Sequence, residues 1–189
     1  VEERPIRKII KHPLYQYDPD ESSPYDIALI ELDGSPVNIT KYPIICLPNI
    51  HGDGSNLGMP DEDVVVAGWG KSQEGEDASP VLLETPLKIL DPNLPEWCEP
   101  YTNGATALVI CAGDLSGQEI HGPCGGDSYA VGVMRSGVAG CGNKSAMYIR
   151  VGGFIDWICE QSEWTANQCT IETTRIFEKK EREIWPLNI

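Results

Sequence analysis

The chain has 189 residues, of which 41% are apolar, and its 14 basic and 29 acidic residues give a net charge of −15. The composition is that of an ordinary globular protein, and the length allows one large domain or two small packed lobes. Nucleic acids and anionic membrane surfaces are bound mainly through Lys and Arg, which are scarce here. No apolar run approaches the roughly 20 residues that span a bilayer. We therefore expect no nucleic-acid partner and no membrane partner.

The cysteines, which are many for a cytosolic protein, and two glycosylation triplets indicate an extracellular setting. None of the seven cysteines forms a Cys-x-x-Cys pair, so the spacings of zinc ribbons and thioredoxins are absent. Two glycosylation triplets, Asn38-Ile39-Thr40 and Asn143-Lys144-Ser145, favour secretion. The chain begins at Val1 without an initiator Met or an apolar signal region, which predicts a processed or partial chain.

Short apolar runs separated by Gly, Pro, Asp and Ser predict strands and turns. The expected strands cover 6–10, 26–32, 64–70, 81–90 with an interruption near Pro86, 107–113, 129–134 and 147–151. Residues 33–63 are expected to be mostly loop, and so is the glycine-rich stretch 113–128. A helix is predicted over 154–160, and the charged segment 176–185 fits a solvated helix or a disordered tail. This pattern is all-β with a terminal helix, as in a barrel or sandwich.

The strongest chemical signal is Cys124-Gly125-Gly126-Asp127-Ser128, together with Asp26 at the head of an apolar strand. Glycines leave backbone N–H groups free to turn toward a developing oxyanion, and a serine beside them can attack a carbonyl. A Gly-Asp-Ser triplet alone is equally typical of an ordinary turn, so its neighbours in the sequence decide its meaning.

Those neighbours resemble the trypsin-like (chymotrypsin-fold) serine peptidases over residues 1–163, which leaves 164–189 as a charged tail. The resemblance implies a double β-barrel with a C-terminal helix. The matching pieces, in the family's order, are His12-Pro13-Leu14-Tyr15, Tyr25-Asp26-Ile27-Ala28-Leu29, Ile45-Cys46-Leu47-Pro48, Ala67-Gly68-Trp69-Gly70, Ile110-Cys111-Ala112-Gly113, Cys124-Gly125-Gly126-Asp127-Ser128, Gly140-Cys141-Gly142, Tyr148-Ile149-Arg150-Val151 and Phe154-Ile155-Asp156-Trp157-Ile158.

The resemblance implies a role for each matching site residue. Ser128 is the nucleophile, and Asp26 is the carboxylate that orients a catalytic histidine. The backbone N–H groups of Gly126 and Ser128 form the oxyanion hole. Asp127 matches the carboxylate that pairs with the amino terminus freed on activation.

The resemblance also places the specificity pocket at Gly122, Gly137 and Ala146. Gly122 stands where the family reads the substrate side chain and is not acidic. Ala146 stands where a pocket-wall glycine is common, and Arg135-Ser136-Gly137 replaces the usual Ser-Trp-Gly. We therefore expect a small or apolar side chain at the cleavage position instead of Arg or Lys.

Family disulfides are implied for Cys98 with Cys111 and for Cys124 with Cys141. Cys46 matches a cysteine that bridges to an upstream segment in many members. Cys159 and Cys169 have no clear family partner and can pair with each other.

Three departures from the family pattern bear on activity. The catalytic histidine is missing, because His12 occupies the family's ordinary His-Pro turn, and His51 and His121 lie in loops without the right neighbours. In the family, a Gly-Gly-Pro turn and a core strand follow the serine. Here Ser128 is followed at once by residues that resemble the strand after that one. One strand of the second barrel is therefore expected to be absent, which opens its core. The first barrel is expected to retain only its last portion.

Two functions follow. The first is a serine endopeptidase acting through an acyl-enzyme, of which this chain is a partial and by itself inactive piece. The second is a non-catalytic, secreted homologue that binds or regulates other proteins.

Two other classes of site have little support. Residues Asp18–Ser22 resemble the opening of a calcium loop but lack its Gly and closing Glu, so they fit a solvated acidic loop. Nothing singles out a carboxylate pair for glycoside hydrolysis. We expect a protein or peptide substrate, no cofactor and no metal.

Overall fold

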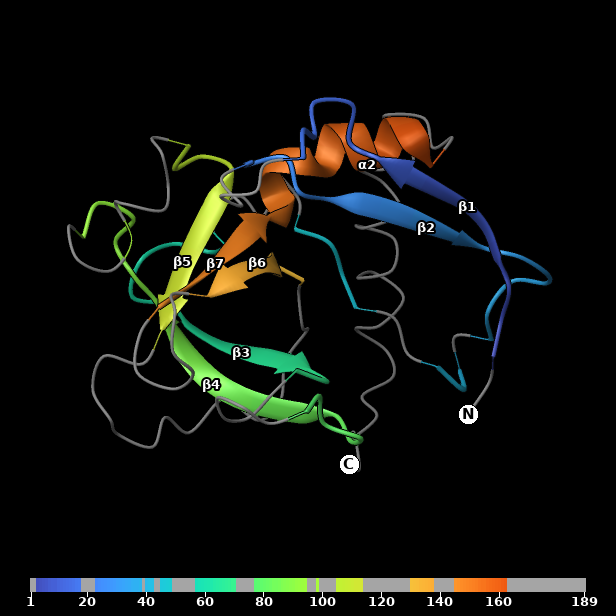
Figure 1. Cartoon of the computed structure of the whole chain (residues 1–189), viewed down its shortest axis with the longest axis horizontal. Coiled ribbons are helices and arrows are strands. Elements are labelled where there is room, and N and C mark those ends of the chain that lie inside the picture. Colours follow the sequence, from blue (N-terminus) through green and yellow to red (C-terminus); the bar gives the residue numbers. More distant parts are fainter. Residues whose placement is uncertain are drawn as a thin grey trace, which may run out of the picture.

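The computed structural model describes residues 3–17, 23–38, 40–42, 45–48, 57–70, 77–94, 98, 105–113, 130–137 and 145–162. Within these ranges the fold consists of two antiparallel sheets and one C-terminal helix (Figure 1). The all-β prediction with a terminal helix is therefore confirmed. The elements are β1 (Ile6–Lys11), β2 (Ala28–Leu32), β3 (Asp63–Gly68), β4 (Leu83–Ile89), β5 (Val109–Gly113), β6 (Gly132–Gly137), β7 (Ala146–Arg150), the 3-10 helix η2 (Val151–Phe154) and α2 (Ile155–Gln161).

The larger sheet has five strands in the order β3-β4-β5-β7-β6, with every neighbouring pair antiparallel. It bends, so that β3 and β4 lie across from β5, β7 and β6 in Figure 1. Residues on β3 alternate between exposed and half-buried, which is the period-2 pattern of a strand with one face toward a core. The inner face of the bend holds one cluster of apolar side chains: Ile89, Ile110, Ala112 and Tyr148, with Val64, Val66, Leu87, Val131 and Ala146 packed against them.

The outer face of β5 and β7 carries the larger core. Val109 and Ile149 are both fully buried there. They belong to the same cluster as Phe154 of η2 and Ile155 and Ile158 of α2. The backbone passes from β7 directly into η2, so the helix folds back over the face of the strand that precedes it. Ile27 and Leu29, which lead into and begin β2, pack on the same cluster and attach the smaller sheet to it.

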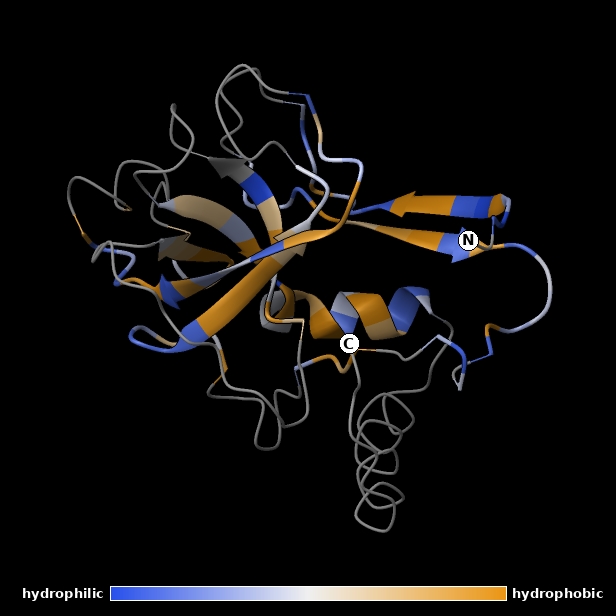
Figure 2. Cartoon of the chain, turned by 90° about the horizontal axis from the view of Figure 1, so that it is seen from below, coloured by the Kyte–Doolittle hydropathy of each residue, from blue (hydrophilic) through white to orange (hydrophobic). Residues whose placement is uncertain are grey.

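The smaller sheet is the β1–β2 hairpin, which extends beside α2 and away from the larger sheet (Figures 1 and 2). Arg7 and Glu31 form an ion pair across it, with 2.8 Å between Nη1 and Oε1. Its opposite side is apolar but open to solvent: Ile6, Ile9, Ile30 and Leu32 are each about half exposed, and the hairpin is largely hydrophobic in Figure 2. Of the first of the two expected barrels, the described residues contain this two-stranded hairpin.

The predicted interruption at Pro86 is wrong. Strand β4 runs without a break from Leu83 to Ile89, and Pro86 pairs in register with Val65. Strand β5 pairs with β4 only from Lys88 onward, so within the described ranges Pro86 has a neighbouring strand on one side only. A sheet tolerates proline at such an edge position, because no second hydrogen-bond partner is lost.

Two further boundaries differ from the prediction. Strand β6 begins at Gly132 and extends to Gly137, with a register irregularity between Met134 and Ser136, whereas 129–134 was expected. The predicted helix is preceded by a 3-10 turn, and α2 starts at Ile155. Neither helix has a side-chain N-cap, so the local sequence contains no capping residue to mark its start.

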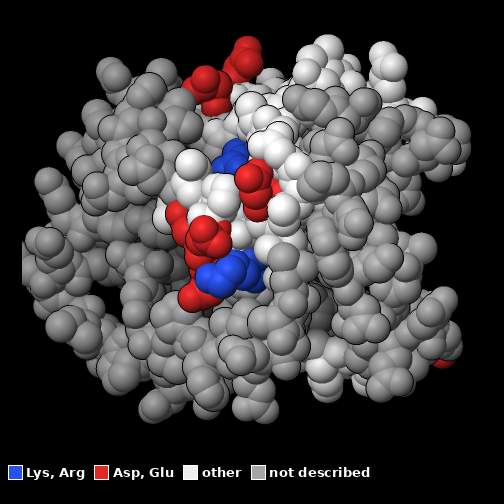
Figure 3. Space-filling view, turned by 90° about the vertical axis from the view of Figure 1, so that its left-hand side faces the viewer, with Lys and Arg blue, Asp and Glu red and all other residues white. Residues whose placement is uncertain are grey.

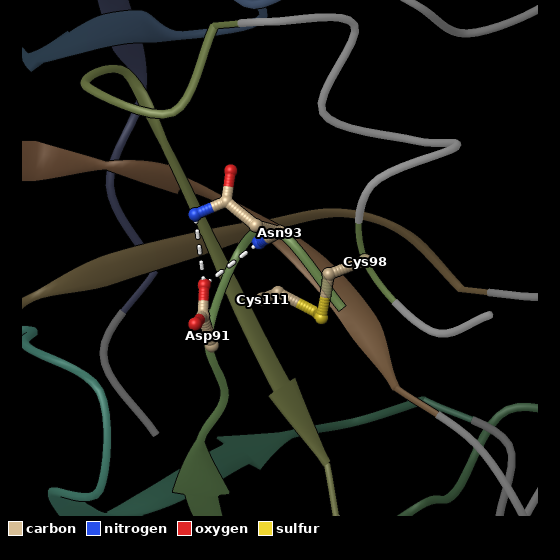
Figure 4. The surroundings of a disulfide bond; sticks show 4 residues. All are labelled: Asp91, Asn93, Cys98 and Cys111. Atoms are coloured by element: carbon tan, nitrogen blue, oxygen red, sulfur yellow. Dashed lines mark hydrogen bonds between the residues drawn. A yellow bond between two sulfur atoms is a disulfide. The ribbon is translucent and has the colours of Figure 1, made fainter. Parts of the chain in front are cut away.

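The predicted disulfide between Cys98 and Cys111 is confirmed (Figure 4). Its two Cα atoms lie 5.8 Å apart, and both residues are buried. The bond joins β5 to the turn that follows β4. In that turn, a carboxylate oxygen of Asp91 accepts hydrogen bonds at 2.9 Å from the backbone and side-chain nitrogens of Asn93.

Two further cysteines lie on the described part of the chain. Cys159, on α2, is also disulfide-bonded, and its pairing with Cys169 stays a prediction because Cys169 lies outside the described residues. The carbonyl of Cys46 accepts a 2.9 Å hydrogen bond from the backbone N–H of Ala130, which ties the 45–48 segment to the residues before β6. The upstream bridge of Cys46 is likewise untested.

Removing the Cys98–Cys111 bond is expected to destabilise the fold substantially. The bond closes a loop with a sequence separation of 13 residues. A loop of that size is worth about 3 kcal/mol in the chain-entropy model. The double variant Cys98→Ala/Cys111→Ala should lose this amount in urea unfolding followed by far-UV circular dichroism. A loss below about 1 kcal/mol, within the range of surface substitutions, would contradict the prediction.

Candidate active site

Asp26 lies immediately before β2, at the base of the hairpin. The backbone there is fixed by a 3.1 Å hydrogen bond from the N–H of His12 to the carbonyl of Ile27 and by a 2.8 Å bond from the N–H of Ile27 to the carbonyl of Tyr25. Asp26 is exposed, and among the described residues its carboxylate has no hydrogen-bond or ion-pair partner. The backbone around Asp26 is thus held in place, and its exposed carboxylate is accessible to a hydrogen-bond donor.

His12 is the single histidine on the described part of the chain, and aromatic rings surround it. Its ring stacks on Tyr25 with 5.0 Å between centroids, and it meets the edges or faces of Phe154 at 5.2 Å and Trp157 at 4.9 Å. Its Nδ1 accepts a hydrogen bond of 3.3 Å from the backbone N–H of Leu14. Burial among these rings lowers the pKa of His12. His12 is therefore part of a structural contact, in agreement with its interpretation as a turn histidine.

This aromatic cluster joins the hairpin, near the start of the described residues, to the C-terminal helix. His12 and Tyr25 flank the hairpin strands, while Phe154 and Trp157 are three residues apart around the start of α2 and so project from the same side. Sequence reasoning did not find the cluster. The signal available was the 154/157 spacing of two aromatic residues, but nothing local connects that spacing with residues more than 120 positions earlier.

Of the predicted pocket residues, the structure brings Gly137 and Ala146 together. They are register partners at the adjoining ends of β6 and β7. Ala146 is half-buried and packs on the inner cluster, and the preceding Ser145 is 2% exposed. The strand irregularity just before Gly137 is of the kind that redirects a strand next to a functional site. Gly122 lies outside the described residues.

The remaining predicted site residues also lie outside the described ranges, so their roles stay predictions. They are Ser128 as nucleophile, Gly126 for the oxyanion hole, Asp127 as the activation carboxylate, and the Cys124–Cys141 disulfide; His51 and His121 lie outside as well.

Charged side chains gather on another face, where β3 begins and β4 ends (Figure 3). Lys88 contacts the carboxylate of Asp63 at 2.9 Å. Glu62 accepts a 2.8 Å bond from the N–H of Gly58 and lies near Arg150, where its charge opposes the lowering of the Arg150 pKa that burial causes. These contacts hold the loop before β3 against β7. Within the described ranges, no three His, Cys, Asp or Glu side chains are placed to hold a metal, and no helix is long and apolar enough to cross a membrane.

Comparison with known proteins decides the family. The family model described as Trypsin matches residues 1–158. The chain belongs to the trypsin family of serine peptidases.

Individual trypsin-family relatives agree with this assignment. The chain is 33% identical to the CLIP domain-containing serine protease HP8 of Bombyx mori over 183 residues, which cover 86% of this chain and 47% of that protein. It is 31% identical to the suppressor of tumorigenicity 14 protein homologue of Bos taurus, covering 85% of this chain and 19% of that one. The chain thus spans less than half the length of these relatives.

Solved structures confirm the chymotrypsin fold. Neuropsin, a serine protease expressed in mouse brain, superimposes with a TM-score of 0.68 over 85% of this chain and 72% of its own, at 24% identity. A similarity at this level of identity establishes the fold only.

The His12 cluster is expected to make stability pH-dependent. Because burial lowers the pKa of His12 in the folded state, the unfolded chain binds the proton first as the pH falls. The contribution of His12 is therefore complete above its usual pKa of 6.5 and is lost as the pH drops from there through the lowered folded value.

The variant His12→Phe, which keeps an aromatic ring but cannot titrate, should flatten the decrease in thermal midpoint between pH 7 and pH 5. Lys8→Gln, on the exposed part of β1, serves as the control and should leave the slope as it is. An identical slope in His12→Phe and the unsubstituted chain would show that the histidine is not desolvated.

Proposed function

We propose that this chain is part of the catalytic domain of a secreted serine endopeptidase, with Ser128 as the nucleophile and Asp26 as the carboxylate that orients the base. Membership of the trypsin family supports the reaction class. The hydroxyl of Ser128 would attack the substrate carbonyl, and the N–H groups of Gly126 and Ser128 would stabilise the oxyanion. Asp127 would serve the activated state by pairing with a freed amino terminus. The disulfide between Cys98 and Cys111 supports an oxidising, extracellular setting.

The observation that carries the proposal is the contrast between Asp26 and His12. The Asp26 carboxylate is exposed and has no partner within the described residues, although its backbone is held in place. His12, the histidine nearest to it in sequence, is occupied by three aromatic rings and by the N–H of Leu14. His51 and His121 lack the family's neighbours in the sequence, so we infer that the base that Asp26 would orient is a histidine outside this sequence. Without it, the serine hydroxyl stays protonated at neutral pH, and the chain alone is inactive.

A second function, a non-catalytic protein-binding homologue, is favoured by the pocket residues. Ala146, the register partner of Gly137, stands where the family commonly has a glycine, and its methyl group would narrow the predicted pocket. The net charge of −15 suits a surface that attracts basic proteins. In the peptidase alternative, the same residues favour a small or apolar side chain at the cleavage position.

The proposal predicts no turnover by the 189-residue chain. Hydrolysis of peptidyl p-nitroanilides with Ala, Val or Arg at the cleavage position should equal that of the Ser128→Ala control. Turnover that Ser128→Ala abolishes would mean that a base is present in the chain. This result would contradict the proposal that the catalytic histidine lies outside this sequence.

The complementary experiment uses the longest transcript that contains this sequence. A product with an additional Ala-Ala-His-Cys segment should hydrolyse these substrates, and Asp26→Asn should lower kcat by about 10⁴, as loss of the orienting carboxylate does in the triad. A product identical to this chain would favour the binding function instead.

A further inference from the structure

Strands β3 and β6, the two outer strands of the five-stranded sheet, line the same cavity. The cavity has a volume of about 280 Å³. Its walls include Val64–Ala67 on β3, Gly132–Met134 on β6 and the preceding Val131, and none of the described residues that line it is charged. Among the residues that the structure describes, both strands have a neighbour on one side only, so each presents there an edge of backbone N–H and C=O groups.

The strand directions show why β3 and β6 cannot pair antiparallel with each other as the other neighbouring strands of the sheet do. Each of the four pairings from β3 to β6 is antiparallel, so β3 and β6 run in the same direction. A single strand that runs the opposite way can pair antiparallel with both and close the sheet into a six-stranded barrel.

Side-chain exposure indicates that such a strand would cover apolar surface. Met134 is the register partner of Tyr148, which is buried in the inner cluster, and partners across a pair of strands share a face. Met134 is nevertheless 60% exposed. On the opposite edge, Val64 and Val66 pack against the same inner cluster and are only half-buried. Since a cavity of about 150 Å³ holds a benzene-sized group, the observed volume accommodates about two aliphatic side chains.

We propose that this groove binds an extended peptide from another polypeptide, about six residues long, with alternating apolar side chains and basic residues at its carboxyl end. The length follows from β3 and β6, which have six residues each. The charge follows from the direction, because a strand antiparallel to β3 ends beside Asp61 and Asp63, which are both exposed. Lys88 neutralises Asp63, whereas Asp61 has no ion-pair partner within the described residues. The net charge of the chain also favours a cationic partner.

This chain offers no matching segment between β5 and β6. Residues 114–129 contain two aliphatic side chains, Leu115 and Ile120, and no alternation. The proposal uses no catalytic residue, so it stands apart from the peptidase assignment. The binding mode is strand addition, in which the backbone supplies affinity and alternate side chains supply selectivity.

The probe is a fluorescein-labelled peptide, Val-Thr-Val-Thr-Val-Thr-Lys-Lys-amide, titrated with the full chain and followed by fluorescence anisotropy. We expect saturable binding and slower hydrogen exchange at amides of both β3 and β6. An isomer with the valines grouped, and a version with Glu in place of Lys, should each bind about tenfold more weakly or less.

The matched variants place a lysine on two exposed apolar sites. Met134→Lys puts a charge in the groove and should weaken binding by about tenfold or more, while Met134→Leu should retain it. Ile30→Lys alters a side chain of similar exposure on the hairpin and should leave binding unchanged. Thermal unfolding of each variant verifies that it is folded.

Several results would overturn the proposal. These are no saturable binding up to about 1 mM peptide, equal weakening by Ile30→Lys, equal affinity for the grouped isomer, or exchange protection confined to one of the two strands. A dimer that Met134→Lys dissociates, with no binding of peptide by the monomer, would identify a second copy as the occupant and would also overturn it.

Discussion

The packing of the outer face of β5 and β7 against η2 and α2 is the interaction on which the rest of the structure depends. Val109 and Ile149 are fully buried in this layer, where each apolar side chain removed from water contributes about 1.5–3 kcal/mol. The disulfide bonds and the hairpin are both connected to this layer. Cys111, which bonds to Cys98, and Cys159 on α2 are both members of the same cluster. The hairpin reaches it through Ile27, Leu29 and the rings around His12.

This arrangement explains how candidate site residues far apart in sequence obtain fixed positions. Asp26 lies on the hairpin side of the core, one residue after Tyr25, whose ring is part of the aromatic cluster. Gly137 and Ala146 lie at the adjoining ends of β6 and β7, and β7 forms part of the core itself. Two apolar surfaces are left exposed to solvent: the open side of the hairpin and the groove between β3 and β6. Such surfaces mark sites of association in soluble proteins.

The sequence predicted the family, the strand pattern and the Cys98–Cys111 bond, because these depend on ordered motifs and on period-2 alternation. It did not predict that β4 continues through Pro86, since the effect of a proline depends on whether a neighbouring strand is paired at that residue. The aromatic cluster was missed for a related reason. His12 and Trp157 are brought together only by the packing of the hairpin on the core. The absence of one strand of the second barrel stays a prediction, because residues 114–129 lie outside the described ranges, and the cavity between β3 and β6 is defined only by the observed order β3-β4-β5-β7-β6.

Amide hydrogen exchange tests the account most directly, because it reports strand by strand which backbone groups are paired and buried. The structure predicts the slowest exchange in β5 and β7, at residues such as Ala112 and Ile149, which have a partner strand on both sides. It predicts faster exchange at the outward amides of β3 and β6, each of which has one partner strand in the part of the chain that the structure describes. Equal protection of β3, β6 and the central strands in the isolated chain would show that the sheet is closed, and would contradict both the open barrel and the groove inferred from it.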